Sequence, residues 1–256
     1  MGWVERPDGA RIAYDVAGDP RRPALLLLGG IGGDASTWRR DLPRLAAELF
    51  VLVLDHRGIG GSSAPDRPTT MTTYVDDALA VLDELRVERT HVYGHSFGSL
   101  VALELALTHP ERVRSIVVGA GRPEPSRSIR SRGRAPLGRP WEQLYAEAFV
   151  REHPEAIEED RRATVRRPAG ERRQAEAAKR WDPDDRLREI RAPVLVLHGS
   201  ADRLTDPANA RILAAEIAGA ELVILEGAGH AFHSEMPERA DDIVLDFVRR
   251  HRSDER

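Results

Sequence analysis

Ser96 stands at the centre of the pentapeptide GHSFG, a G-x-S-x-G pattern that can place a nucleophilic serine on a sharp strand-to-helix turn. A strand-like run, Thr90–Tyr93, precedes it, and a run of strong helix formers, Phe97–Leu107, follows it. Gly94 and Gly98 suit such a turn, because strand and helix backbones crowd together there. A serine at this place could instead cap the helix, but the order of strand, pattern and helix favours a nucleophile.

A serine hydroxyl attacks a carbonyl group only when a base removes its proton. The predicted base is His230, in the glycine-rich segment GAGHAFH after the strand-like run Glu221–Leu225. His233 is its rival, with loop packing as its expected role. Asp202, in LHGSADRLTD after the run Pro193–Leu197, is predicted to orient the imidazole and to stabilise its charged form.

Acyl transfer also needs hydrogen-bond donors for the oxyanion that develops on the carbonyl oxygen. The backbone N–H of Phe97 is one predicted donor. The second is expected from the GGIGG loop after Ala24–Leu28, from Ile31, although this loop could also be a plain glycine-rich turn. Two polar neighbours receive other predicted roles: His198 is structural, and Asp206 caps the helix that begins at Pro207.

The elements that must position these residues alternate between strand and helix, which predicts a parallel sheet with helices on both faces. In such sheets the chemistry lies in loops at the carboxyl ends of the strands, where Ser96, Asp202 and His230 all fall. The predicted strands are Trp3–Arg6, Arg11–Val16, Ala24–Leu28, Phe50–Leu54, Thr90–Tyr93, Val113–Val118, Pro193–Leu197 and Glu221–Leu225. The predicted helices are Ser36–Leu49, Thr72–Leu85, Phe97–Leu107, Pro207–Ile217 and Pro237–Arg250.

The segment from Arg122 to Arg191 interrupts this alternation. It opens with a Pro-, Gly-, Ser- and Arg-rich stretch up to Pro140, which predicts a loop. The segment carries 18 Lys and Arg against 14 Asp and Glu, whereas the whole chain has a net charge of −4. This balance fits a solvated helical insertion with salt-bridged faces, and it also fits a surface that receives an anionic substrate or carrier.

Several aromatic residues are candidates for an apolar acyl pocket, with simple core packing as the alternative. Within the Arg122–Arg191 segment, apolar residues recur at helical spacing and predict one helix face. The members of that face are Trp141, Leu144, Tyr145, Ala148 and Phe149. The pocket candidates are Trp38, Trp141, Tyr145, Phe149 and Trp181.

The bulk composition excludes several classes of protein and site. The chain has no Cys, so disulfides, thiolate metal sites and cysteine nucleophiles are absent. The longest dense apolar run, Ala24–Leu28, is too short to cross a bilayer, and the N-terminus lacks the apolar region of a secretory signal. We therefore expect a cytoplasmic protein. No nucleic-acid-binding pattern occurs, and the sequence leaves open whether the protein is a monomer or a homodimer.

Five motifs resemble those of the α/β-hydrolase fold superfamily: LLLLGGIGGDASTW, LDHRGIGGSS, VYGHSFGS, LHGSADRL and GAGHAFHSEMPE. The chain looks most like small capped esterases and enol-lactonase-like members. The resemblance implies a mostly parallel sheet of about eight strands flanked by helices, with residues 1–121 and 192–256 as the core domain and 122–191 as a helical cap. It implies that Ser96, Asp202 and His230 form a catalytic triad and that Ile31 and Phe97 form the oxyanion hole. It implies no cofactor and no metal.

The chain departs from the family pattern where His-Gly usually ends the oxyanion strand, because Gly29 stands at the position of the His. The missing imidazole is expected to remove a hydrogen-bonding support of that loop. The family's D-x-R-G-x-G-x-S turn runs from Asp55 to Ser62 and is interpreted as structural. Ser96 also excludes haloalkane dehalogenases and epoxide hydrolases of this fold, which need an Asp there.

The expected function is hydrolysis of a carboxylic ester of a small or medium-sized apolar substrate through an acyl-enzyme. A lactonase, a thioesterase or a biosynthetic cyclase would use the same triad, and perhydrolysis could accompany it as a side reaction. A small-ligand receptor is the non-enzymatic alternative.

Overall fold

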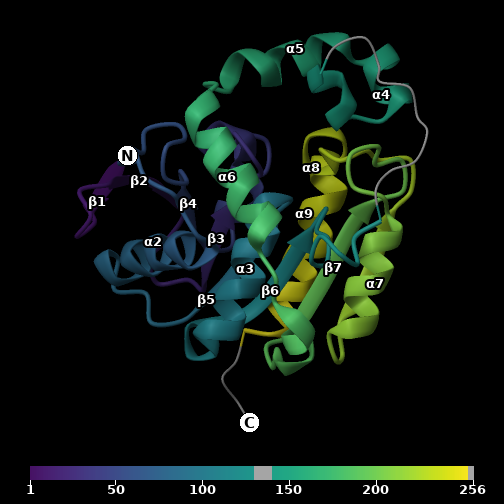
Figure 1. The fold of residues 1–256 in the computed structure, drawn as a ribbon. Helices are drawn as coiled ribbons and strands as arrows, with labels where there is room; N and C mark the ends of the chain where they lie inside the picture. The colour runs from purple at the N-terminus through teal and green to yellow at the C-terminus, as the bar shows by residue number, and fades with distance from the viewer. Residues whose placement is uncertain (130–139, 253–256) are drawn as a thin grey trace.

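The chain forms an eight-stranded sheet with the order β1-β2-β4-β3-β5-β6-β7-β8 in a computed structural model, which describes residues 1–129 and 140–252 (Figure 1). β1 and β2 pair antiparallel, β2 pairs antiparallel with β4, and all later pairs are parallel. This architecture confirms the predicted fold class. The strands are β1 (Gly2–Glu5), β2 (Arg11–Ala17), β3 (Ala24–Leu28), β4 (Phe50–Leu54), β5 (Thr90–His95), β6 (Val113–Gly119), β7 (Val194–Gly199) and β8 (Glu221–Leu225).

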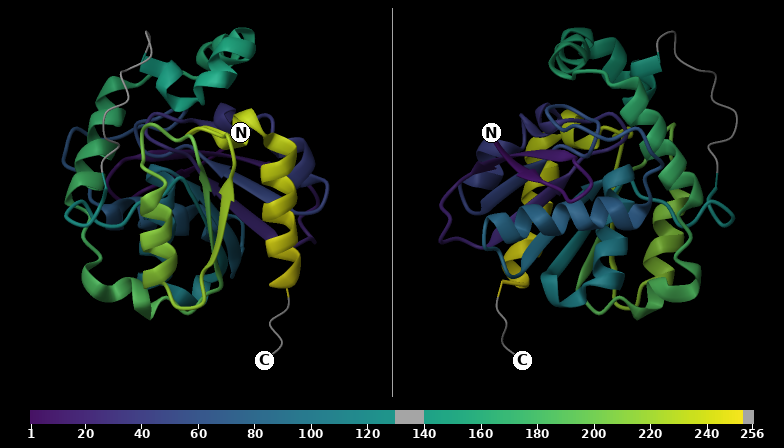
Figure 2. Two further views of the ribbon diagram at one scale, coloured as in Figure 1. Left: turned by 90° about the vertical axis from the view of Figure 1, so that its right-hand side faces the viewer. Right: turned by 60° about the vertical axis from the view of Figure 1, so that its left-hand side comes forward.

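Helices cover both faces of the sheet, with α9 on the face opposite to α2 and α3 (Figure 2). The α-helices are α1 (Leu42–Ala46), α2 (Met71–Glu84), α3 (Phe97–Thr108), α4 (Glu147–Glu152), α5 (Pro154–Ala163), α6 (Pro168–Arg180), α7 (Ala208–Glu216), α8 (Phe232–Glu235) and α9 (Pro237–Arg250). Short 3₁₀ helices span Ala35–Trp38, Pro110–Arg112, Pro140–Leu144 and Asp184–Glu189.

The core lies on both sides of the central strands because successive strand residues point to opposite faces. In β3, Leu26 and Leu28 pack in a cluster with α2, α3 and α7, whereas Leu25 and Leu27 pack with α1 and α9. All four side chains are fully buried. A strand that is apolar on both faces is expected in a parallel sheet covered by helices.

Two predicted helices are broken in the structure. The run Ser36–Leu49 splits into a 3₁₀ helix and α1, because Pro43 starts a helix readily but cannot continue one from the preceding turn. The predicted face from Trp141 to Phe149 splits at Ala146, which has an extended backbone and donates its N–H to the Glu235 carboxylate instead of to a helical carbonyl. The first break thus has a local cause, whereas a tertiary contact accounts for the second.

We call residues 140–191 the cap segment. Its helices α4 and α5 stand beyond the end of the sheet toward which β7 points, and α6 runs down beside α3 (Figures 1 and 2). Of the predicted loop between Arg122 and Pro140, residues 130–139 lie outside the described residues. In the described ranges no helix is long and apolar enough to span a membrane.

Candidate active site

Ser96 occupies the turn between β5 and α3 with φ 53° and ψ −112°, a backbone conformation that a residue other than glycine rarely adopts. Its neighbouring glycines are required by close packing. A Cβ on Gly94 would lie 2.2 Å from the carbonyl oxygen of Gly98, and a Cβ on Gly98 would lie 2.0 Å from that of Leu28. The G-x-S-x-G pattern therefore lets α3 begin directly against the sheet. A strained residue of this kind is typical of functional sites.

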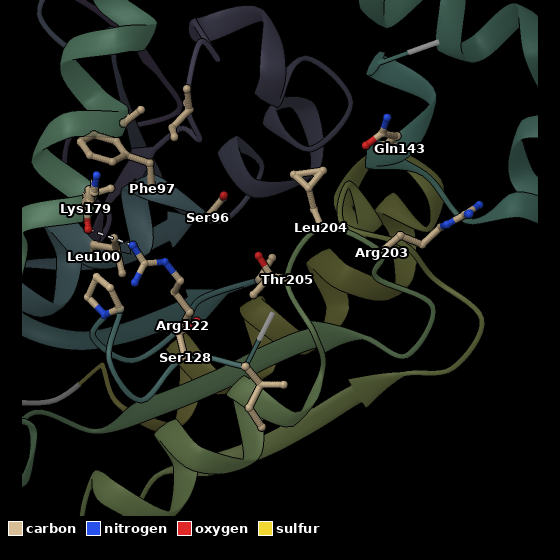
Figure 3. Close-up of a pocket in the computed structure, with 16 residues that line it drawn as sticks. Ser96, Phe97, Leu100, Arg122, Ser128, Gln143, Lys179, Arg203, Leu204 and Thr205 are labelled. Atoms are coloured by element: carbon tan, nitrogen blue, oxygen red, sulfur yellow. Dashed lines mark hydrogen bonds between the residues drawn. The ribbon is translucent and has the colours of Figure 1, made fainter. Parts of the chain in front are cut away.

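The turn is fixed to the neighbouring strand, since the N–H of Ser96 donates to the carbonyl oxygen of Gly119 at the end of β6, at 2.7 Å. The side chain of Ser96 is half-buried and lines a cavity of about 620 Å³. Figure 3 shows its hydroxyl directed into that cavity. The hydroxyl is thus held by the sheet and accessible to a small molecule.

Asp202 and His230 form a buried pair on the loops after β7 and β8. Nδ1 of His230 donates to Oδ2 of Asp202 at 2.7 Å. The other carboxylate oxygen accepts the backbone N–H groups of Leu204 and Thr205 at 2.8 and 2.9 Å. These bonds fix the imidazole so that its second nitrogen, Nε2, is the one left for proton transfer.

The pKa of Asp202 lies well below its usual range, so the group is an anion in the folded protein. Burial by itself would raise this pKa, but the charge of His230 and the hydrogen bonds from His198 and His230 outweigh burial. His198 contributes because its Nε2 lies 3.0 Å from Oδ2 of Asp202. Its predicted structural role thus extends to the carboxylate that orients His230.

His95 joins the Ser96 turn to the His230 loop. Its Nε2 donates to the carbonyl oxygen of His230 at 2.9 Å. Burial, reinforced by His233 and His230, holds the pKa of His95 well below its usual range, so the ring is neutral. No local sequence pattern indicates this contact, because only the folded sheet brings the loops after β5 and β8 together.

Ile31 and Phe97, the predicted oxyanion donors, both line the cavity beside Ser96. Among the described residues, neither backbone N–H has a hydrogen-bond partner. Two unpaired N–H groups beside Ser96 are chemically able to receive a developing oxyanion. The assignment of this role to Ile31 and Phe97 stays a prediction.

A buried imidazole lies near the loop that follows β3. It belongs to His56, on the loop after β4, and burial lowers the pKa of His56 to about 4, with the backbone of Gly29 opposing this effect. Its ring meets the ring of Phe97 edge-on, with centroids 5.2 Å apart. The expected loss of a hydrogen-bonding support at Gly29 stays a prediction.

The cap segment also holds this loop. The N–H of Gly32 donates to Oε1 of Gln174 in α6 at 2.8 Å, and the Gln174 side chain is fully buried. The two residues are 142 positions apart in the sequence. Nothing in the local sequence around Gln174 marks it, so sequence reasoning missed it.

The cavity is lined by the following residues: Ile31, Ser96, Phe97, Leu100, Ala120, Arg122, Pro125, Ser128, Ile129, Gln143, Ala175, Ala178, Lys179, Arg203, Leu204 and Thr205 (Figure 3). Its apolar members are mostly aliphatic. Its charged members are Arg122, Lys179 and Arg203, and no Asp or Glu lines it among residues 1–129 and 140–252 with described side chains.

The five aromatic pocket candidates do not line this cavity, which corrects the prediction. Trp38 is buried in the core, 4.8 Å from the ring of Tyr93. Trp181 packs in the core on the opposite face and donates Nε1 to Glu104. The other three, Trp141, Tyr145 and Phe149, belong to a separate apolar cluster that joins the cap segment to Ala231. All five side chains lie in apolar clusters, which fits the alternative role of simple core packing.

The other predicted polar residues have structural surroundings. His233 is buried with Nδ1 3.6 Å from Asp41, and its ring packs on Trp38. Asp206 accepts the N–H of Ala208 at the start of α7, at 2.9 Å, which fits a helix cap. His233 therefore stands behind the site, away from Asp202.

The D-x-R-G-x-G-x-S turn is pinned as predicted. Asp55 accepts the N–H groups of Ala35 and Gly61 at 2.7 and 2.8 Å. Arg57 forms a bidentate pair with Asp77, with both N···O distances 2.6 Å. In residues 1–129 and 140–252 no cluster of three or more His, Asp or Glu residues is arranged to hold a metal ion.

Known proteins have this fold and are similar in sequence along most of the chain. A family model described as alpha/beta hydrolase fold matches residues 23–237. The chain is 31% identical over 255 residues to a protein of Azorhizobium caulinodans named as carbamate hydrolase RutD, covering 93% of this chain and 95% of that protein. It is 28% identical over 248 residues to 3-oxoadipate enol-lactonase 2 of Acinetobacter baylyi, with 93% and 92% covered.

A solved structure agrees. The crystal structure of a hydrolase from Pseudomonas aeruginosa PA01 superposes with a TM-score of 0.83 at 29% identity, covering 96% of this chain and 97% of that one. The family match spans most of the chain and includes the loops that carry Ser96, Asp202 and His230. This protein therefore belongs to the α/β hydrolase fold family.

Proposed function

We propose that the protein is a serine hydrolase that cleaves carboxylic esters, with Ser96 as nucleophile, His230 as base and Asp202 as the group that orients the base. One observation carries the proposal. Ser96 has a left-handed backbone at the cavity wall and is tied through His95 to the loop whose His230 is hydrogen-bonded to Asp202. Relatives named as hydrolases of ester-like or carbamate bonds support the same class of reaction.

The proposed reaction has two acyl-transfer steps. His230 takes the proton of the Ser96 hydroxyl as its oxygen attacks the ester carbonyl, and the anionic Asp202 stabilises the imidazolium. The N–H groups of Ile31 and Phe97 hold the oxyanion of the tetrahedral intermediate. His230 then protonates the leaving alkoxide, and in the second step it activates the water that releases the acid.

Residues 122–191 are proposed to act as a cap over this site. The cap segment supplies Gln143, Ala175, Ala178 and Lys179 to the cavity lining, whereas the core supplies Ser96 and the oxyanion donors. A substrate in the cavity would therefore lie between the two parts. Removal of bulk water by such a cover strengthens every electrostatic interaction inside the site.

The experiment that tests the function compares the wild-type protein with Ser96→Ala on a panel of p-nitrophenyl esters. We expect Ser96→Ala to lower kcat by at least about a thousandfold, because the residual rate then comes from binding and the oxyanion hole alone. Labelling with a fluorophosphonate provides a second measure, with one adduct on the wild-type protein and none on the variant. Retained turnover in Ser96→Ala would refute the proposal. A wild-type protein that forms no adduct would favour the receptor alternative.

Lactone hydrolysis is the second candidate. A relative that matches over 93% of this chain is named as an enol-lactonase, and a lactone is an ester closed into a ring. The same triad would open it without a departing alcohol. Rates on matched cyclic and linear esters of equal carbon number separate the two candidates.

A further inference from the structure

Every charged residue that the structure describes in the cavity lining is basic: Arg122, Lys179 and Arg203. Arg203 faces Glu147 of the cap segment at 3.8 Å. In contrast, neither Arg122 nor Lys179 forms an ion pair with a carboxylate of the described residues.

Arg122 is held in place by neutral groups. Its Nη1 donates to the carbonyl oxygen of Pro123 at 2.9 Å, and its Nη2 donates to that of Ala178, in α6, at 2.8 Å. A guanidinium has five N–H donors, so most of them remain for a ligand. Carbonyl oxygens orient the group without cancelling its charge. The nearby Glu124 is itself paired with Arg127, at 3.2 Å.

The backbone position of Arg122 is also fixed by hydrogen bonds at the end of the sheet. It follows β6 through Ala120, whose φ of 47° places a non-glycine residue in the left-handed region. The N–H of Ala120 donates to the carbonyl oxygen of Leu197 at 2.9 Å, which holds this unfavourable turn. The adjacent Gly119 is the residue that binds the N–H of Ser96. The carboxyl end of β6 thus fixes the positions of both Ser96 and Arg122.

The guanidinium is partly removed from water. Arg122 is half-buried, and burial lowers its pKa, with the charge of Glu124 opposing this effect. Arginine nevertheless keeps its proton in proteins. Because this half-buried cation forms no ion pair with a described carboxylate, a bound anion would offset its desolvation cost. Figure 3 shows Arg122 and Arg203 on opposite sides of Ser96, with Lys179 on the Arg122 side.

We propose that Arg122, assisted by Lys179, binds a carboxylate of the substrate, so that the protein acts on anionic esters or lactones whose carboxylate is separate from the scissile carbonyl. The proposal rests on the proposed function, because it assigns the occupant of the same cavity. It replaces the apolar substrate expected from the sequence. The aliphatic lining, including Leu100 and Ile129, would contact the chain between the two carbonyl groups.

The kinetic experiment uses two anionic esters and their neutral carboxamide isosteres. Monomethyl adipate carries the carboxylate on the acyl side, and 5-acetoxypentanoate carries it on the alcohol side, with methyl adipamate and 5-acetoxypentanamide as the neutral partners. Hydrolysis is followed by proton release. We expect the wild-type protein to prefer one anionic ester over its amide by about tenfold or more in kcat/KM, mainly through KM, as a charge-assisted bidentate contact implies.

Three variants locate the effect. Arg122→Gln should lower the ratio of kcat/KM on the anionic ester to kcat/KM on its amide to about one, and an unchanged circular dichroism spectrum shows that the variant is folded. Arg122→Lys should retain part of the preference, since an ammonium binds a carboxylate through a single point of charge. Arg180→Gln is the matched control: it neutralises the exposed cation next to Lys179, outside the cavity lining, and should leave the preference unchanged.

A binding measurement separates this proposal from the proposed function. Titration calorimetry of Ser96→Ala with the same four compounds should detect the anions more tightly than the amides, and Arg122→Gln in that background should abolish the difference. If this binding is found but the wild-type protein hydrolyses no ester, the catalytic proposal fails and the carboxylate site stands. If esters are hydrolysed with no preference for either anion, or if Arg122→Gln slows anionic and neutral esters equally, the carboxylate site is refuted.

Discussion

Nε2 of His95 donates a hydrogen bond to the carbonyl oxygen of His230 over 2.9 Å, so the residue next to Ser96 holds the backbone of the proposed base. The bond crosses 135 positions of sequence and joins the loops after β5 and β8. Because the ring of His95 is buried and neutral, it can act as a fixed donor across the pH range in which enzymes of this class work. The distance between Ser96 and His230 thus depends on a residue outside the triad.

Replacing His95 tests this dependence. His95→Phe keeps an aromatic ring but leaves the carbonyl of His230 without its donor, so the loop can shift. We expect kcat to fall by about ten- to a hundredfold with little change in KM, because small misplacements of a catalytic group are costly. His95→Gln, which can still donate, should recover much of the loss. Equal kcat values for the wild-type protein and His95→Phe would show that the bond does not position His230.

Asp202→Asn should lower kcat by about 10³- to 10⁴-fold, because an amide neither fixes the imidazole tautomer nor stabilises its charge. The low pKa of Asp202 makes it an anion from neutral into acidic pH, despite the opposing effect of burial. The measurement is kcat on a p-nitrophenyl ester together with the rate of fluorophosphonate labelling, and both should fall. Asp206→Asn, at the nearby helix cap, is the control and should keep kcat within about threefold, as surface positions usually do. Equal effects of the two substitutions would contradict the assignment.

Gln174→Leu should weaken oxyanion stabilisation without creating a large cavity in the core. The substitution leaves the N–H of Gly32 without its acceptor, which costs about 1–3 kcal/mol for a buried donor. If the loop relaxes, kcat should fall about tenfold while KM stays nearly constant, because the oxyanion exists only in the transition state. Affinity for a phosphonate transition-state analogue should fall in parallel. Glu176→Gln, exposed on the same helix, serves as control; a loss confined to KM would argue against this role for Gln174.

Asp241 should make stability depend on pH. Burial, and then the charge of the neighbouring carboxyl of Asp41, raise the pKa of Asp241 in the folded protein. A raised acid pKa contributes stability that is complete below the unfolded-state pKa and is lost as pH rises toward the folded-state value. In that window the free energy of unfolding should fall by up to about 1.4 kcal/mol per pH unit.

Asp241→Asn cannot ionise, so it should lose this dependence and become more stable than the wild-type protein at alkaline pH. Urea unfolding at pH 5 and pH 8 measures the difference. Asp242→Asn, at the exposed neighbouring position, should follow the wild-type profile. Parallel profiles for the wild-type protein and Asp241→Asn would show that the buried carboxyl pair does not control stability in this range.

The sequence by itself determined the fold class and the order of the elements. Ala24–Leu28, Phe50–Leu54 and Glu221–Leu225 were predicted with the bounds that the structure has. These predictions rest on local physics, because a short apolar run between turn residues has few ways to bury itself. The GHSFG pattern was informative for a related reason: a Cβ on Gly94 would collide with Gly98 in the same turn, and a Cβ on Gly98 would collide with Leu28 at the end of the adjacent strand β3.

Tertiary structure alone decided what surrounds Ser96. His56 against Phe97, Gln174 against Gly32 and Arg122 beside the cavity each depend on elements that meet only after the sheet has formed. The aromatic residues predicted for the pocket went into the core and the cap cluster instead. Periodicity shows that a side chain will be buried, but which residues it meets depends on packing between distant segments, and no local pattern encodes that choice.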